Sequence, residues 1–164
     1  MPITQSSLIE IRRTPHKGRG VFAREFIASG TVFERAPVLV MPAHEALGTP
    51  EDTVLSHYLF EWGKNTVALA LGYGSLYNHS YSPNARYEDE GRQMKAYIAV
   101  RDILPGEEIT INYNGSEDAV DPVWFDVVEN TRKSTAEKEK QTTAVKKNRR
   151  AESDRRRSSA KKPR

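Results

Sequence analysis

The sequence contains no cysteine, only four histidines, and no apolar run long enough to cross a bilayer. The lack of cysteine excludes disulfide bridges and thiolate zinc sites, and the histidines are too scattered to suggest a metal cluster. A membrane-spanning helix needs roughly 20 apolar residues, and the polar N-terminus has no apolar signal-peptide core. We therefore expect a soluble intracellular protein, in the cytoplasm, nucleoid or nucleus, whose fold is stabilised by packing without a metal.

Length and charge divide the chain into an acidic body and a basic tail. The 164 residues suffice for one domain with a hydrophobic core. Residues 131–164 hold 14 Lys and Arg against 4 Asp and Glu, a net charge of +10, whereas residues 1–130 hold 11 against 18, a net charge of −7. An acidic body attracts basic partners, and a basic tail favours acidic or phosphate-bearing ones.

The tail, residues 131–164, has almost no apolar side chains. Because burial cannot offset the entropy of ordering such a segment, we predict that it is disordered. Its basic clusters lie at residues 155–157 and 161–162. The segment is either a nucleic-acid-binding arm or targeting signal, or a solubilising extension.

Short strand-like segments dominate the body. Those rich in branched or aromatic residues and bounded by Gly, Pro or Ser lie at residues 8–11, 20–23, 31–33, 38–41, 94–100 and 108–113. One helical insertion is predicted at about residues 49–64, where Thr49 can cap, Pro50 suits the first turn, and an apolar stripe at helical spacing reaches Trp62. We therefore predict one mostly β domain over residues 1–130.

Three separated segments carry candidate chemistry. In KGRGVFA, residues 17–23, two glycines allow close approach of a ligand to the backbone, although a hairpin turn also explains them. In NHSYSPNARY, residues 78–87, polar turn residues lie in the middle of the domain, where Asn and His can satisfy main-chain groups that no ladder reaches. GEEITINY, residues 106–113, is a turn into a strand that ends on tyrosine. Each segment alone has a structural explanation.

In this order and at these separations, the three segments resemble the SET domain of protein-lysine methyltransferases. In that family a Gly-x-Gly segment, an Asn-His-Ser-x-x-Pro-Asn segment and a Glu-Glu-[Leu/Ile]-x-x-x-Tyr segment meet around S-adenosylmethionine. The resemblance covers residues 8–115, including the flanking IAVRDILPGEEI. It implies the β-clip fold of small sheets, with a pseudoknot in which the last strand passes beneath a loop near the Asn-His segment. Threading of this kind is rare, and it would make residues 77–84 both a buried crossing and a site.

The resemblance also implies roles for individual residues. The cofactor-binding residues are expected to be Lys17, Gly18, Arg19, Gly20, Asn78, His79, Tyr113 and Trp124. Tyr113 matches the family's catalytic tyrosine, with its hydroxyl near the sulfonium and its ring along the lysine channel. Tyr87 falls where several family members place a second channel tyrosine, and we treat it as a further catalytic candidate. The alternative role for Tyr87 is a structural one, an aromatic contact with a side chain on the neighbouring strand.

Lysine methylation requires little of the protein beyond positioning. A neutral amine attacks the methyl carbon of a sulfonium in line, so a lysine with a pKa near 10.4 must first lose a proton. A narrow apolar channel helps because desolvation lowers the pKa of an amine. Alignment of the two reactants then supplies most of the acceleration, and no nucleophilic side chain is needed.

The sequence departs from the family pattern in three places. A Tyr-x-Gly that many members carry is absent from FERAPVLVMPAH, residues 33–44, and Ser75 stands where an Arg often precedes the Asn-His pair. The cysteine-rich, zinc-binding C-terminal module is missing as well. DPVWFDVV, residues 121–128, is the candidate replacement, in which Trp124 and Phe125 either fold back onto the site or anchor the chain end in the core.

We therefore predict an S-adenosylmethionine-dependent protein-lysine methyltransferase acting on a basic protein or peptide, such as a histone-like or ribosomal protein. The alternative is a SET-like binding module without turnover, tethered to nucleic acid by the tail. A third possibility is that Lys133, Lys138 or Lys140 enters the protein's own channel, so that the tail is substrate or inhibitor. The target lysine, the number of methyl groups and the oligomeric state, a dimer included, stay open.

Overall fold

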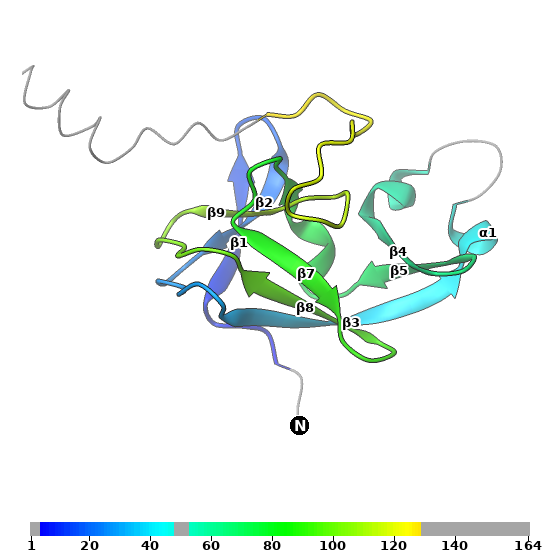
Figure 1. Cartoon of the computed structure of the whole chain (residues 1–164), viewed down its shortest axis with the longest axis horizontal. Coiled ribbons are helices and arrows are strands. Elements are labelled where there is room, and N and C mark those ends of the chain that lie inside the picture. The colour runs from blue at the N-terminus through cyan, green and yellow to red at the C-terminus, as the bar shows by residue number, and fades with distance from the viewer. Residues whose placement is uncertain (1–3, 48–52, 129–164) are drawn as a thin grey trace, which may run out of the picture. The chain divides into compact units, whose positions relative to one another are not determined.

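Strands make up most of the regular structure in the computed structural model, which describes residues 4–47 and 53–128. Within these residues they form a four-stranded and a five-stranded sheet (Figure 1). The first has the order β1-β2-β9-β6, made of β1 (Ile9–Thr14), β2 (Gly18–Ala23), β9 (Glu108–Ile111) and β6 (Asn78–His79). The second has the order β4-β5-β3-β8-β7, made of β4 (Leu59–Gly63), β5 (Thr66–Ala70), β3 (Val32–Pro42), β8 (Met94–Ala99) and β7 (Ala85–Asp89). The mostly β class is confirmed.

The four-stranded sheet contains the chain crossing predicted for residues 77–84. Strand β9 lies between β2 and β6, antiparallel to the first and parallel to the second. Beyond β6 the side chain of Asn84, which is 1% exposed, continues the contact with β9. Its Oδ1 accepts from the Thr110 amide at 2.8 Å, and its Nδ2 donates to the Glu108 carbonyl at 2.8 Å. The Asn-His segment is thus fixed along the last strand, because polar side chains there replace a regular ladder.

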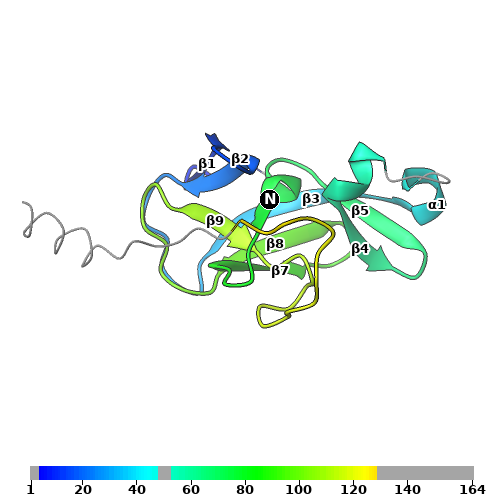
Figure 2. The ribbon, with the colours of Figure 1, turned by 90° about the horizontal axis from the view of Figure 1, so that it is seen from above.

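The five-stranded sheet is organised around β3, the longest strand (Figure 2). It pairs antiparallel with β8 over its first half and with β5 over its second half. Strand β8 is buried on both faces, since Lys95 and Tyr97 on one face and Ala96 on the other are each under 5% exposed. Strand β7 pairs with β8 in a register that places Asp89 opposite Lys95.

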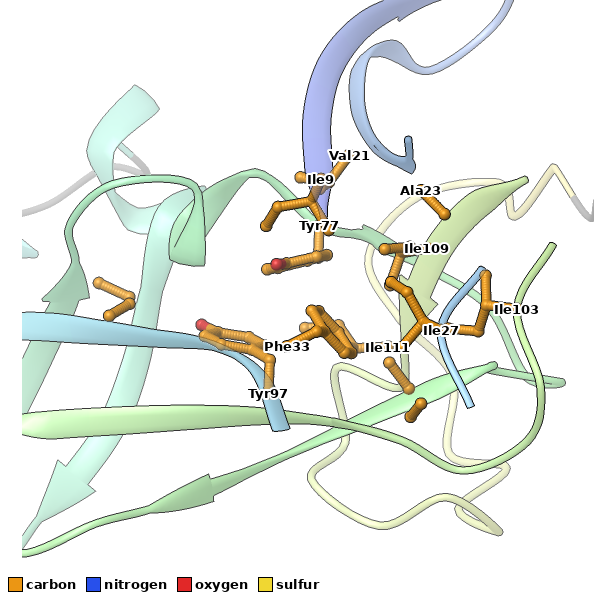
Figure 3. Close-up of a cluster of buried hydrophobic side chains, with 14 of the residues drawn as sticks. Ile9, Val21, Ala23, Ile27, Phe33, Tyr77, Tyr97, Ile103, Ile109 and Ile111 are labelled. Carbon is orange, nitrogen blue, oxygen red and sulfur yellow. The ribbon is translucent and has the colours of Figure 1, made fainter. Parts of the chain in front are cut away.

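The hydrophobic core joins residues of both sheets (Figure 3). Its most buried large side chains include Ile9, Val21, Ile109, Ile111, Phe33, Tyr77 and Tyr97. The Tyr77 ring stacks on Tyr97 with centroids 4.6 Å apart and meets Phe33 edge-on at 6.1 Å. Full burial of a large apolar side chain contributes about 1.5–3 kcal/mol. Tyr77 therefore anchors the Asn-His segment that follows it directly.

The helical insertion predicted at residues 49–64 is shorter than expected, and its second half is wrong. Val54–Tyr58 forms the 3₁₀ helix η1, capped by Thr53, whose side-chain oxygen accepts from the Ser56 amide. Thr49 and Pro50, the predicted start, lie outside the described residues. Leu59–Gly63 is strand β4, not a helical turn.

The β4–β5 hairpin explains the error. Phe60 and Trp62 pack against the core while Glu61 between them is exposed, which is the period-two pattern of a strand. The two-residue turn that follows contains Asn65 with φ of 61°, a conformation that asparagine tolerates better than most residues. Tertiary packing and the turn together override a helical spacing that the same apolar residues also satisfy.

Two further short helices are present, α1 (Ala43–Ala46) and the 3₁₀ helix η2 (Gly74–Leu76). The described residues belong to a single compact unit spanning Met1–Glu129. None of their helices has the length and apolar character needed to span a membrane. The basic tail, residues 131–164, lies outside the described residues, so its boundary and its disorder stay predictions.

Candidate active site

Two adjoining cavities lie where the three motif segments meet. The larger has a volume of about 820 Å³ and the smaller about 440 Å³. The residues that line both are His57, Tyr58, Ser75, Tyr77, Tyr113 and Trp124. The two cavities therefore adjoin beside Tyr113.

The glycine segment forms one wall of the larger cavity. Lys17, Gly18 and Arg19 line it, and Gly18 has a φ of 73° that favours glycine. Gly20 is not among the described residues that line this cavity, and its part in cofactor binding stays a prediction. A Cβ added there would lie 2.7 Å from Glu108 Oε1 and 2.8 Å from Asn78 Nδ2. Gly20 thus permits the close approach of β2, β6 and β9 on which the cavity depends.

Asn78 ties the glycine segment to the other two motifs. Its Nδ2 donates to the Arg19 carbonyl at 2.9 Å and to Glu108 Oε1 at 2.7 Å. The second carboxylate oxygen of Glu108 lies 3.4 Å from Lys17 Nζ. One buried carboxylate thereby holds both Lys17 and Asn78 at the wall of the larger cavity.

His79 positions Tyr113 through the backbone. Its side chain is 3% exposed, and Nδ1 accepts a hydrogen bond from the Tyr113 amide at 3.1 Å. The two rings lie 5.3 Å apart between centroids. This contact fixes the end of β9 against the Asn-His segment, so that the tyrosine side chain leaves the strand at a defined place.

The Tyr113 hydroxyl is fixed at the junction of the cavities. It donates to the Tyr77 carbonyl at 2.8 Å. Burial, followed by the nearby Tyr58 and Glu108, raises the pKa of Tyr113 to about 12. The phenol therefore keeps its proton at neutral pH, and its donor is already engaged, so its oxygen lone pairs are the groups left to face a ligand.

Tyr77 belongs to the predicted site segment, residues 77–84, but had no predicted role of its own, and it supports Tyr113 directly. Its own hydroxyl donates to Glu34 at 2.5 Å, and Glu34 also accepts from the Tyr73 amide at 3.2 Å. Burial raises the pKa of Glu34, although these hydrogen bonds oppose the rise. The segment before the Asn-His pair is thus held from behind by a buried carboxylate on β3.

Tyr87 lines the smaller cavity and not the larger one. It also sits opposite Tyr97 in the β7–β8 register, with ring centroids 6.5 Å apart, and meets Phe60 edge-on at 5.1 Å. The Tyr87 ring is thus both a cross-strand contact and part of the wall of the smaller cavity, and its role as a second channel tyrosine stays a prediction. Burial, with Asp89 and Glu61 adding to it, raises the pKa of Tyr87.

The segment after β9 folds back onto the site. Asn112 Nδ2 donates to the Ala119 carbonyl at 2.7 Å, and Asn114 Nδ2 donates to the Asp121 carbonyl at 2.8 Å. Trp124 then lies 6.1 Å from the Tyr113 ring at an interplanar angle of 26°, and Phe125 lies 6.0 Å from it. Because Trp124 is 61% and Phe125 40% exposed, they cover the larger cavity without anchoring the chain in the core.

Three more residues shared by the cavities were not predicted to line the site, although Ser75 was noted as a departure from the family pattern. His57 packs against Trp124 with ring centroids 5.6 Å apart, and Tyr58 follows it in η1. Ser75 Oγ donates to the Tyr58 carbonyl at 2.8 Å and so fixes η1 above the site. Tyr58 has the spacing of the apolar stripe predicted for residues 49–64, and such a stripe usually packs in the core, so the sequence did not indicate its position on the cavity wall.

Charge differs between the two cavities. Among the described residues, the ionisable side chains around the larger cavity are mostly basic: Arg13, His16, Lys17 and Arg19 outnumber the single carboxylate of Asp126. Those around the smaller cavity are Glu61 and Asp121, together with the shared His57 and the tyrosines. The larger cavity therefore suits a ligand with an anionic group, and the smaller one suits a cationic side chain.

The matched protein family accounts for this arrangement. The family model described as the SET domain matches residues 18–114. The chain belongs to the SET-domain family. This SET domain is 38% identical over 127 residues to a Schizosaccharomyces pombe protein named histone-lysine N-methyltransferase, H3 lysine-37 specific, and the match covers 77% of this chain and 82% of that protein.

A solved structure gives the same family. The SET domain here matches the crystal structure of a candidate histone methyltransferase from Plasmodium falciparum with a TM-score of 0.56 and 33% sequence identity. The match covers 70% of this chain and 97% of the other. The family and the lysine methyltransferase activity predicted from the three motifs are confirmed.

Proposed function

We propose that this SET domain transfers a methyl group from S-adenosylmethionine to the side-chain amine of a lysine in a histone-like basic protein. The observation that carries the proposal is the pair of cavities of different charge that share Tyr113 as a common wall. One cavity is suited to the methyl donor and the other to the methyl acceptor. The reaction needs both to meet in line.

The residues of the larger cavity fit S-adenosylmethionine. Its volume of about 820 Å³ lies within the range of ligand sites. Arg13, Lys17 and Arg19 provide positive charge for a carboxylate, and the backbone around Gly18 provides amides and carbonyls. Trp124 and Phe125 provide aromatic surface for a purine. When bound, the cofactor supplies a methyl group on a positively charged sulfur.

The residues of the smaller cavity fit a lysine side chain. Tyr87, Phe60 and Tyr113 give it aromatic walls, and Glu61 and Asp121 give it acidic groups that attract a cation from solution. Entry into an aromatic channel removes water from the amine, which lowers its pKa and favours the neutral nucleophile. We therefore expect the protein to bind the lysine as a cation and to favour its deprotonation inside.

At the junction, Tyr113 orients the reacting groups. Its hydroxyl proton is directed to the Tyr77 carbonyl. Its lone pairs can then accept weak C–H···O contacts from a polarised methyl group, a second-order stabilisation that adds to alignment. Because the raised pKa keeps the phenol neutral, Tyr113 is proposed to act by orientation and not as a general base.

Charge and the relative support a histone-like substrate. Residues 1–130 carry a net charge of −7, which favours a basic segment. The S. pombe relative is named for lysine 37 of histone H3. We extend the proposal to a lysine in a histone-like tail, with the basic residues 131–164 contacting nucleic acid nearby.

The test is transfer of isotope-labelled methyl groups. The protein is incubated with labelled S-adenosylmethionine and a mixture of core histones, ribosomal proteins and acidic control proteins. We expect label on lysine of histones, located by mass spectrometry. Label only on ribosomal proteins would contradict the histone-like substrate, and no label on any protein would favour the binding module without turnover.

A truncated chain separates the roles of body and tail. A chain ending at Asn130 should retain methyl transfer and lose salt-sensitive DNA binding, because only the basic tail would contact phosphates. Loss of transfer on truncation, or methyl groups found on Lys133, Lys138 or Lys140, would instead assign the tail to the reaction.

A further inference from the structure

Lys95 on β8 is a buried cation that the proposed reaction does not use. It is 1% exposed, although lysine is almost never fully buried unless it is paired. Its Nζ forms an ion pair with Asp89, which lies directly opposite on β7. Burial lowers the pKa of Lys95, and the contact with Asp89 opposes that shift. An apolar residue would fill this position at lower cost if packing were its only role.

Three aromatic rings surround the ammonium. Lys95 Nζ lies 4.4 Å from the centroid of Tyr87, 4.5 Å from that of Phe60 and 5.2 Å from that of Trp62. All three distances are within the roughly 6 Å at which a cation is attracted to the face of a ring. Lys95 thus occupies an aromatic cage, defined by Tyr87, Phe60 and Trp62.

The rings of the cage come from the two opposite edges of the five-stranded sheet. Phe60 and Trp62 lie on β4 and Tyr87 lies on β7, at the two ends of the order β4-β5-β3-β8-β7. Phe60 and Tyr87 nevertheless meet edge-on at 5.1 Å. A single ammonium therefore contacts rings from both edges.

Two rings of the cage also form the wall of the smaller cavity. Phe60 and Tyr87 are among its lining residues, whereas Lys95 and Trp62 are not among the described residues that line it. The ammonium therefore lies behind this wall. Whatever holds these two rings in place also sets the position of this wall, and with it the room left in the cavity between the wall and Tyr113.

We propose that Lys95 is a specificity-determining positioning residue, whose ammonium holds Phe60 and Tyr87 together and thereby fixes the width of the lysine channel. The inference rests on the proposed function of the smaller cavity. A channel of fixed width distinguishes an unmethylated amine from a bulkier methylated one by steric fit. Without the cation the two rings lose a shared partner, and the channel accepts the larger group more readily.

The test compares Lys95→Met, which keeps the length of the side chain and removes its charge, with Lys64→Met at an exposed lysine in the β4–β5 turn. The measured quantity is the ratio of kcat/KM for an unmethylated lysine peptide to kcat/KM for the same peptide dimethylated at that lysine. In Lys95→Met we expect this ratio to fall by about three- to tenfold relative to wild type. The ratio should be unchanged in Lys64→Met.

This ratio does not depend on how much of the enzyme is folded, because both peptides meet the same active fraction. A second variant, Trp62→Leu, weakens the cage at a ring outside the cavity wall and should lower the ratio in the same direction by a smaller factor. The affinity for S-adenosylmethionine should stay within about twofold in both variants, since the larger cavity is not altered.

An NMR measurement tests the cage without activity. The side-chain CH₂ protons next to Lys95 Nζ should be shifted upfield by the ring currents of the three aromatics, and the signal should be missing in Lys95→Met. A signal at the position of exposed lysines would overturn the proposal, as would an unchanged peptide ratio in both cage variants of an active enzyme. A wild-type protein that transfers no methyl group would overturn the proposed function, and this inference with it.

Discussion

Asn84 gives the sharpest test of how the crossing supports the site. The residue is 1% exposed and makes two 2.8 Å hydrogen bonds to the backbone of Thr110 and Glu108, with a third of 3.3 Å from Nδ2 to Glu107 Oε1. Replacement by alanine removes all three and leaves a backbone N–H and a C=O without this partner between buried strands. The strand that they hold leads directly to Tyr113.

The magnitude follows from those two backbone groups. An unsatisfied buried polar group costs about 1–3 kcal/mol, so two cost about 2–6 kcal/mol before any water enters the vacated space. We expect Asn84→Ala to lower the free energy of unfolding by about 3 kcal/mol, which is a large share of the 5–15 kcal/mol typical of a domain. Hydrogen exchange at the Thr110 amide should accelerate as well, because its acceptor is gone.

Urea denaturation followed by circular dichroism measures the change. The matched control is Asn114→Ala, which removes one 2.8 Å hydrogen bond from an exposed asparagine to the Asp121 carbonyl and should cost about 1 kcal/mol or less. If the two variants lose the same small amount, Asn84 does not hold the crossing and the reasoning is refuted.

Two further predictions follow from the site. The pKa of Tyr113 is about 12 in the folded protein against an ordinary value of 10.0, so the neutral phenol adds to the free energy of unfolding. This contribution should be fully present below pH 10 and should be lost as the pH rises from 10 to 12. Free energies of unfolding measured over this pH range for wild type and Tyr113→Phe check the prediction. An equal decline in both proteins would show that Tyr113 is not the group responsible. Trp124→Ala should weaken binding of S-adenosylmethionine about tenfold, because the ring stacks on Tyr113 beside the cofactor cavity. The melting temperature should stay within about 2 °C of wild type, because the ring is 61% exposed. Calorimetry showing unchanged affinity would remove Trp124 from the cofactor site.

The sequence was sufficient to predict those site residues whose role follows from the backbone conformation of their own short segment. Gly18 requires a positive φ, Asn84 replaces a strand ladder, and Tyr113 ends a strand after a turn, and each requirement leaves a short pattern. These patterns were sufficient to locate the crossing and one wall of each cavity. Gly20 also has a packing role, since a Cβ there would meet Glu108 and Asn78, and its part in cofactor binding stays a prediction.

Residues brought to the site by tertiary packing left no such pattern. Tyr58 reaches the junction because η1 docks there, and its neighbours in the sequence do not indicate it. Tyr77 adjoins the Asn-His pair, but no sequence pattern indicated that its carbonyl accepts from the Tyr113 hydroxyl. Strand β4 was taken for the second half of a helix because its apolar residues satisfy both periods, and only the turn at Asn65 shows that a hairpin follows. Lys95 would be placed at the surface by composition alone, since its cage is assembled from strands far apart in the chain.

The central claim is that donor and acceptor meet beside the Tyr113 hydroxyl. Single-turnover methyl transfer to a histone peptide by Tyr113→Phe, with the dissociation constant of S-adenosylmethionine measured on the same protein, tests it most directly. We predict that the rate falls about 100-fold, as is usual when one oriented group at a reacting centre is removed, while the dissociation constant changes by less than about threefold. An unchanged rate would contradict the account.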